Sequence, residues 1–188
     1  ASDSKIYAQK YDTLGNNQWT DDIRIGSANK QELPDLETDS SGALYMCWNN
    51  ISGGNQDTYI DKRLSADGGP DPAWGGELKV NTLADPDAQT HARIDISEQG
   101  STTTTNVVWQ DDRHGSWDVF LQRYDDDKNP LLAPEKRVNT NPVASSTNQY
   151  APVINAGSEA NLYLAWSDSR DGNLNVYGAK IASNTSAL

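Results

Sequence analysis

Apolar and polar residues alternate in short runs along the chain, and three of these runs end in the same arrangement. A Trp closes the run, an Asn or Asp follows two positions later, a Gly six, an Asp or Asn nine and an aromatic residue eleven positions later. The three copies occupy residues 48–59, 109–120 and 166–177, so the frame recurs after 61 and then 57 residues. Such recurrence indicates one structural unit used repeatedly, as in solenoids and propellers.

Each complete unit holds four runs with the length and alternation of a half-buried strand, named A to D here in chain order. No segment has apolar residues at helical spacing, whereas β-branched and aromatic residues gather in these runs. The predicted strands are 5–11 and 19–25 in the first unit; 33–38, 43–48, 58–64 and 74–80 in the second; 92–97, 105–109, 119–124 and 135–138 in the third; and 152–155, 161–166 and 176–181 in the fourth. The pattern therefore predicts an all-β chain.

Four antiparallel strands per unit, running from an inner to an outer strand, describe the blade of a β-propeller. We expect a single domain, 1–188, with about three and a half four-stranded antiparallel blades in the parts 1–27, 28–84, 85–142 and 143–188. Both terminal units contain a strand C, so a closed four-bladed ring would hold one strand too many. The chain is then a fragment of a longer propeller, or assembles with another copy, or displaces a terminal strand. The fragment is favoured, because an open blade edge pairs readily with another chain.

The charge of the chain narrows the classes of partner. With 27 acidic and 15 basic residues its formal net charge is −12, which argues against nucleic acid and against an anionic membrane surface. No run of 18 apolar residues is present, so membrane insertion is not expected. An acidic surface is typical of a salty or extracellular medium. The single Cys47 cannot form an internal disulfide and is predicted to be buried.

The recurring frame Trp-x-Asp-x-Arg-x-Gly-x-x-Asp-x-Tyr resembles the repeats of secreted bacterial and archaeal β-propeller proteins, which are often parts of larger cell-surface or hydrolytic proteins. The resemblance covers residues 5–181. It implies the propeller fold and an extracellular or cell-surface location. It implies no particular function, because such propellers carry unrelated activities.

The repeated Trp residues are predicted to pack between blades, because they share one position of the frame and burial of an indole is worth about 2 to 3 kcal/mol. Trp117 differs from them. The other two units have Gln56 and Leu174 at its place, and a unique aromatic ring in a polar loop is a candidate for ligand binding. His114 and Arg113 lie in the same loop and complete the predicted ligand-binding set.

Carboxylates in the turns between strands B and C are candidate ligands for calcium, which takes six to eight oxygens in irregular geometry. The predicted metal set is Asp111, Asp118 and Asp168. Alternatively, Asp111 and Asp168 accept backbone N–H groups of the turn while Arg113 and Arg170 pair with nearby acids. The second unit has Asn50 and Ser52 at those places, which weakens a metal requirement common to all blades. No cofactor is required on this interpretation, and calcium is an option.

Catalytic candidates are few. His91 precedes the inner strand of the third unit, and His114 lies beside Asp112 on the B-to-C loop, so both are expected on the same side of the blade. A His near acids can act as a general base in a hydrolase or lyase. No nucleophile elbow, zinc motif or phosphate loop is present in the sequence.

These observations favour a non-catalytic recognition or adhesion module of an exported or cell-surface protein, which binds a glycan or a protein through its loops. The first alternative is the propeller part of a polysaccharide hydrolase or lyase. The second is a structural assembly unit that pairs through open blade edges, either with itself or with the remainder of a larger propeller.

Overall fold

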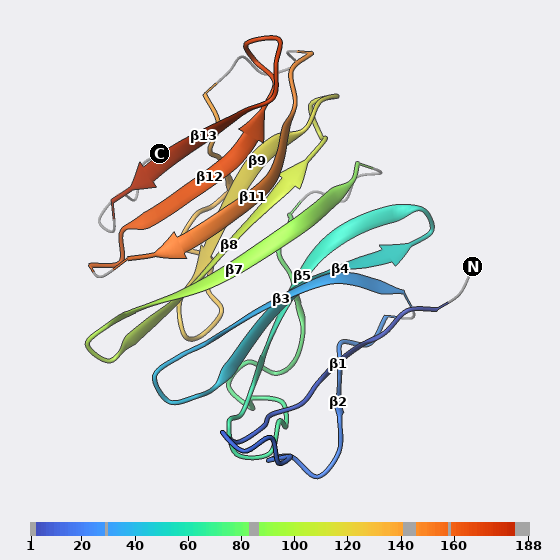
Figure 1. Ribbon diagram of the computed structural model, residues 1–188, viewed down its shortest axis with the longest axis vertical. Helices are drawn as coiled ribbons and strands as arrows, with labels where there is room; N and C mark the ends of the chain where they lie inside the picture. The colour runs from blue at the N-terminus through green and yellow to red at the C-terminus, as the bar shows by residue number, and fades with distance from the viewer. Residues whose placement is uncertain (1–2, 29, 83–86, 141–145, 158, 183–188) are drawn as a thin grey trace.

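A computed structural model of the chain describes residues 3–28, 30–82, 87–140, 146–157 and 159–182. These residues form thirteen strands and no helix, so none of them belongs to a helix that could cross a membrane (Figure 1). The strands are β1 (Ile6–Ala8), β2 (Ile23–Ile25), β3 (Gln31–Thr38), β4 (Leu44–Ser52), β5 (Asn55–Arg63), β6 (Leu78–Lys79), β7 (Gln89–Gln99), β8 (Thr102–Asp111), β9 (Asp118–Tyr124), β10 (Lys136–Arg137), β11 (Gln149–Ala156), β12 (Leu162–Asp168) and β13 (Asn175–Ile181). The all-β prediction is confirmed.

The strands pair into four antiparallel sheets in the orders β1-β2, β3-β4-β5-β6, β7-β8-β9-β10 and β11-β12-β13. The units therefore contribute two, four, four and three strands, as the alternation pattern predicts. Each sheet lies within one of the predicted blade parts, although the junctions at 84/85 and 142/143 fall outside the described residues.

The sheets follow one another as in a fan (Figure 1). The inner strand β7 contacts β3 on one side and β11 on the other. The two-stranded sheet β1-β2 and the sheet β11-β12-β13 lie at opposite ends of the array (Figure 1). Within the described residues the fan is open, in agreement with the expectation that a simple four-bladed ring does not close.

A shared kink shapes the start of every inner strand. Pairing with the next strand shifts register between Glu32 and Asp35 in β3, and at the same place in β7 and β11. The residues at the kink, Leu33, His91 and Ala151, have φ values of 54°, 54° and 48°. Non-glycine residues adopt this left-handed region at an energetic cost. Its recurrence in three blades identifies a built-in β-bulge rather than a local accident.

The cores lie between neighbouring sheets. Trp48, Trp109 and Trp166 belong to three successive clusters and are 0%, 0% and 5% exposed. The predicted packing role of these indoles is confirmed. Cys47 is fully buried and free, as expected, and lies in the cluster between the second and third sheets.

The structure differs from the prediction at the B-to-C connection of the second unit. Residues 49–57 were expected to form a loop, but β4 runs on to Ser52 and β5 starts at Asn55. Gly53 and Gly54, with φ values of 61° and 95°, join the strands directly. Two residues with positive φ make a two-residue hairpin turn whose twist matches the strands, so no longer loop is needed.

The outer strands are shorter than expected. Of the predicted strands 74–80 and 135–138, only Leu78–Lys79 and Lys136–Arg137 form strands, each followed by one further backbone bond to the sheet, from Val80 and Val138. The backbone N–H groups of Trp74 and Gly75 instead bond to the carbonyl oxygen of Asp71, both at 3.0 Å, which closes a turn. Short outer strands limit the exposed edge of each sheet.

Candidate functional site

One end of the blades brings together the segments that the sequence singled out. In the third sheet, Gln89 at the start of β7 pairs with Asp111 at the end of β8, which pairs with Asp118 at the start of β9. Asn139, after β10, donates its amide to Asp118 Oδ1 (2.7 Å) and to Gln149 Oε1 of the next sheet (3.1 Å). We call this end, with the starts of the inner strands and the turns after β4, β8 and β12, the mouth. The expectation that the start of strand A and the B-to-C turn share one side is confirmed.

Asp111 and Arg113 form a buried ion pair at the mouth. Asp111 Oδ1 accepts hydrogen bonds from Arg113 Nε (2.9 Å) and its backbone N (3.0 Å), while Oδ2 accepts from Trp109 Nε1 (3.0 Å). Arg113 Nη1 also donates to Glu135 (2.9 Å), and the guanidinium lies 4.1 Å from the ring centre of Phe120. These contacts agree with the structural interpretation of the turn. Ligand binding by Arg113 stays a prediction, since its donors already serve the fold.

The fourth unit repeats this arrangement with a more exposed arginine, since the Arg170 side chain is 22% exposed and that of Arg113 is 9% exposed. Asp168 accepts from Trp166 Nε1 (3.0 Å) and from Arg170 Nε and backbone N (both 2.9 Å). Burial alone would raise the pKa of Asp168, but these bonds and one from Gln149 outweigh it and lower the pKa to about 2. The guanidinium of Arg170 lies 4.3 Å from the ring centre of Tyr177. The Trp, Asp and Arg of the frame thus form a unit that holds the turn.

Asp118 of the predicted metal set has three side-chain neighbours in hydrogen-bond range. It accepts from Arg137 (3.2 Å) in addition to Asn139, and His114 Nδ1 lies 2.8 Å from its Oδ2. The part of the chain that the structure describes holds no group of three His, Cys, Asp or Glu side chains placed to bind a metal. Asp111, Asp118 and Asp168 therefore each face cationic or amide donors, and calcium at these residues stays a prediction.

Trp117 and His114 lie in the turn between β8 and β9. The backbone N of Trp117 donates to Asn148 Oδ1 (3.0 Å), and its carbonyl oxygen accepts from the backbone N of Gln149 (2.8 Å). These bonds hold the backbone at Trp117 against the start of β11, and its side chain is half-buried. The ring of His114, 30% exposed, lies 5.9 Å from the ring of Phe120. Both stay candidate ligand-binding residues on an anchored turn.

Asp112 contacts the start of β7, and His91 belongs to it. Asp112 Oδ1 accepts the backbone N–H of Ala88 at 2.6 Å, so this carboxylate caps the entry to the inner strand. His91, three residues on, lies at the bulge with φ of 54°. Its Nδ1 is buried and has no hydrogen-bond partner within the described residues. Burial and, after it, the charge of Arg93 lower the pKa of His91, which favours the neutral imidazole.

Two inner-strand acids were not anticipated from the sequence. Asp35 Oδ2 on β3 accepts the backbone N–H of Ile94 on β7 (3.1 Å), and Asp95 Oδ2 on β7 accepts that of Ala156 on β11 (2.6 Å). Burial, followed by the charges of Glu37 and Asp35, raises the pKa of Asp95, although hydrogen bonds from backbone amides oppose this. The signal was present in the sequence, because Asp95 stands between two Ile residues of an alternating strand.

The sequence matches no family model and no curated protein. Solved structures do match. A thermostable family-43 glycoside hydrolase has a TM-score of 0.51 and 9% identity, over 99% of this chain and 70% of that one. The α-L-arabinanase of Penicillium chrysogenum, solved with arabinobiose, has a TM-score of 0.57 and 14% identity, over 90% and 51%. An exo-β-1,3-galactanase of Clostridium thermocellum has a TM-score of 0.50 and 9% identity, over 93% and 38%.

The fold is a β-propeller. At identities of 9% to 14% the likeness establishes the fold alone. The chain spans about half the length of the arabinanase and a smaller share of the galactanase.

Proposed function

We propose that this chain is the propeller part of a polysaccharide-acting glycoside hydrolase, and that a glycan lies at the mouth against His91. The observation that carries the proposal is the unpartnered Nδ1 of His91. The equivalent bulge residues of the neighbouring blades, Leu33 and Ala151, have no polar side chain, so the bulge itself does not need an imidazole. Buried polar atoms are normally hydrogen-bonded. The His91 side chain as a whole is half-buried, so a change of its rotamer would bring Nδ1 to a ligand hydroxyl.

The protonation of His91 suits a sugar. Its lowered pKa favours the neutral ring at neutral pH. A neutral imidazole has one donor and one acceptor nitrogen, and a hydroxyl group can satisfy either. Trp117, His114 and Arg113 lie at the same end and could extend the glycan site. Two of the similar structures support a saccharide ligand for this fold. The arabinanase was solved with arabinobiose, and the other enzyme is named as an exo-β-1,3-galactanase.

Hydrolysis would require an acid that holds its proton near neutral pH. Asp95 best fits that role among the inner-strand carboxyls, because burial raises its pKa. Such a group can protonate a leaving glycosidic oxygen while a second carboxylate acts as base or nucleophile. Asp35, which contributes to the raised pKa of Asp95, supplies the candidate second carboxylate.

Binding is tested by calorimetry with arabino-oligosaccharides and β-1,3-galacto-oligosaccharides. His91→Leu places the residue of the second blade at the same bulge, so the fold should be retained. We expect affinity to fall about fivefold, since one hydrogen bond contributes about 1 kcal/mol. Leu33→Ala at the matching bulge is the control and should leave affinity unchanged. Equal affinity of His91→Leu and the wild type would remove His91 from the site.

A non-catalytic glycan-recognition module is the second candidate. It is favoured by the bonds that Asp35 and Asp95 already make to backbone N–H groups of the next inner strand, because these give both acids a structural role. Release of reducing sugar from arabinan and β-1,3-galactan separates the two. Loss of product in Asp95→Asn with binding retained supports hydrolysis, whereas binding without product in the wild type supports recognition alone. The extracellular location predicted from the acidic surface would bring either activity to polysaccharide.

A further inference from the structure

One position of the repeat carries a cation in every unit. Lys10, Lys62, Arg123 and Lys180 each stand three positions after the aromatic residue that ends the frame. The third unit alone has Arg at this place, and the others have Lys. The position therefore belongs to the repeat, and the units differ in the groups that surround the cation.

The second unit balances its cation with acids. Lys62 Nζ lies 3.1 Å from Asp71 Oδ2 and 5.0 Å from the ring centre of Tyr45. The hydroxyl of Tyr45 in turn donates to Asp39 Oδ2 (3.2 Å). Burial opposes the charge of Lys62, but the bonds to Tyr45 and Asp71 outweigh it and raise the pKa.

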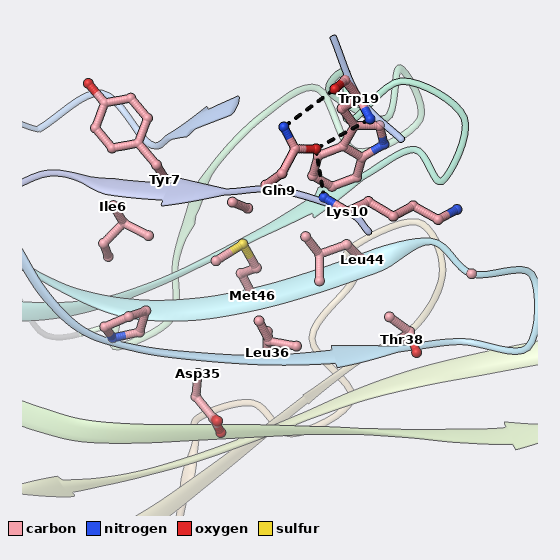
Figure 2. A pocket seen from close by; sticks show the side chains of 13 residues that line it. Ile6, Tyr7, Gln9, Lys10, Trp19, Asp35, Leu36, Thr38, Leu44 and Met46 are labelled. Atoms are coloured by element: carbon pink, nitrogen blue, oxygen red, sulfur yellow. Dashed lines mark hydrogen bonds between the residues drawn. The ribbon is translucent and has the colours of Figure 1, made fainter. Parts of the chain in front are cut away.

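The cations of the first and fourth units are less enclosed. Half-buried Lys10 donates to the hydroxyl and the carbonyl oxygen of Ser65 (2.8 Å and 3.1 Å). It borders a groove of 760 Å³ that Leu36 also lines (Figure 2). Lys180 is exposed and lies 5.6 Å from the ring centre of Tyr163. Water can therefore solvate both ammonium groups.

Arg123 is buried without an acid beside it in the part of the chain that the structure describes. It is 7% exposed, and its Nε donates to Asn106 Oδ1 (3.0 Å). Among the described residues its two Nη nitrogens find no acceptor, yet they are not fully enclosed and so reach solvent. Burial alone lowers the pKa of Arg123, whereas acids raise that of Lys62.

The register of the turns explains the missing acid. The backbone N of Asp71 bonds to the carbonyl oxygen of Lys62 (3.2 Å). In the third unit the backbone N of Leu131 bonds to that of Arg123 (2.8 Å), so Leu131 stands in the place of the acid. A guanidinium stays protonated in a protein, and buried charges are normally paired. In a chain with 27 acidic and 15 basic residues, a buried cation without an acid indicates a ligand of opposite charge.

We propose that Arg123 is the centre of an oxyanion site, which takes a single carboxylate or sulfate group of a small ligand. The Nη edge of the guanidinium presents two parallel N–H donors, which match two oxygens of such a group. Nε is already held by Asn106, which itself donates to Ser97 Oγ (3.1 Å) and to the carbonyl oxygen of Asp95 (3.2 Å). The guanidinium is therefore fixed before the ligand arrives. The net charge of −12 disfavours a larger polyanion.

The site lies on β9, two strands outward from Asp95 on β7, with β8 between them. Its direct test is an NMR titration of the full chain with sodium sulfate and, separately, with sodium acetate, in NaCl that keeps the ionic strength constant. We expect saturable shifts of the Arg123 side-chain N–H groups and the Asn106 amide, with a Kd on the order of 1 mM for at least one anion. Acetate binding assigns the site to carboxylates, and sulfate binding assigns it to tetrahedral oxyanions.

Three variants separate the fork from general charge. Arg123→Gln should weaken binding about tenfold or more, read at the Asn106 amide. Arg123→Lys places here the residue of the other units and should weaken binding severalfold, because it keeps the charge but loses the fork. Arg24→Gln is the matched control and should change nothing, since Arg24 is exposed and bonds only to the carbonyl oxygens of Ser27 and Ala28 among the described residues.

Thermal unfolding supplies a second readout. Sulfate stabilises proteins in general, so the rise in Tm is compared between variants. It should be larger for the wild type than for Arg123→Gln, and Arg123→Lys replaces the latter if it does not fold. Absence of saturation with both anions overturns the proposal. Equal affinity of the wild type and both Arg123 variants would also overturn it, because the anion would then bind elsewhere.

Discussion

The turns that follow the buried Trp in the second and third units share one sequence pattern but have different structures. In the third unit Asp111 accepts from Trp109 and from the side chain and backbone of Arg113, so the chain turns at once. In the second unit Asn50 accepts from Trp48 Nε1 (2.7 Å) and stays within β4. Anchoring the indole thus requires one acceptor of either kind. The carboxylate matters where an Arg brings a buried charge that must be balanced.

The largest test of this difference is removal of the two acceptors. Asp111→Ala should destabilise the protein by about 3 kcal/mol, because it leaves Trp109 Nε1 and Arg113 Nε buried without their acceptor, while Glu135 still pairs with Arg113. Asn50→Ala, the control, should cost about 1 kcal/mol, the worth of one neutral hydrogen bond. Urea unfolding followed by Trp fluorescence measures both. Similar losses at the two sites would show that the ion pair adds nothing to the anchoring of the indole.

A change of pH extends the comparison to the fourth unit, where Asp168 accepts from the equivalent Trp166 and Arg170 and also from Gln149. Its folded pKa of about 2 lies below the ordinary 3.8. A depressed pKa contributes stability that is fully present above the unfolded value and is lost as pH falls toward the folded one. The contribution, about 2 kcal/mol, should therefore disappear between about pH 4 and pH 2.

The measurement is urea unfolding of the wild type and of Asp168→Asn at several pH values. The stability gap between the two proteins isolates this carboxyl from other acids that titrate in the same range. The gap should narrow as pH falls. A gap that stays constant down to pH 2 would mean that the carboxylate charge of Asp168 does not stabilise the turn.

The smallest effect concerns the identity of the cation. Arg170→Lys keeps the charge but loses the planar fork toward Asp168 and the stacking on Tyr177, so we expect a loss of about 0.5 to 1 kcal/mol. Arg24→Lys is the control, because Arg24 is exposed and bonds to the carbonyl oxygens of Ser27 and Ala28. Thermal unfolding at fixed pH compares them. Equal Tm values for the two variants would contradict a special role of the guanidinium in the frame.

The candidate site residues also fall into two groups, those that the fold already uses and those that it does not. Residues that repeat in the frame, such as Asp111 and Asp168, are engaged by the fold. His91, which breaks the pattern of its bulge position, keeps an unpartnered nitrogen. The sequence marked both kinds as candidates, but it did not reveal which donors and acceptors were already used. Asp35 and Asp95 were missed because their partners, Ile94 and Ala156, lie about 60 residues away on neighbouring blades.

The sequence by itself determined the strands, their grouping into units of two, four, four and three, and the burial of the repeated Trp residues. These follow from alternation along a strand, which is a local property with a period of two residues. The two-residue turn at Gly53 and Gly54 is local as well, since Gly-Gly allows the positive φ values of a short hairpin turn. Tertiary structure alone decided the pairing of inner-strand acids across blades and the open groove at Leu36. Each depends on which blade lies beside which, and alternation within one strand carries no information about that neighbour.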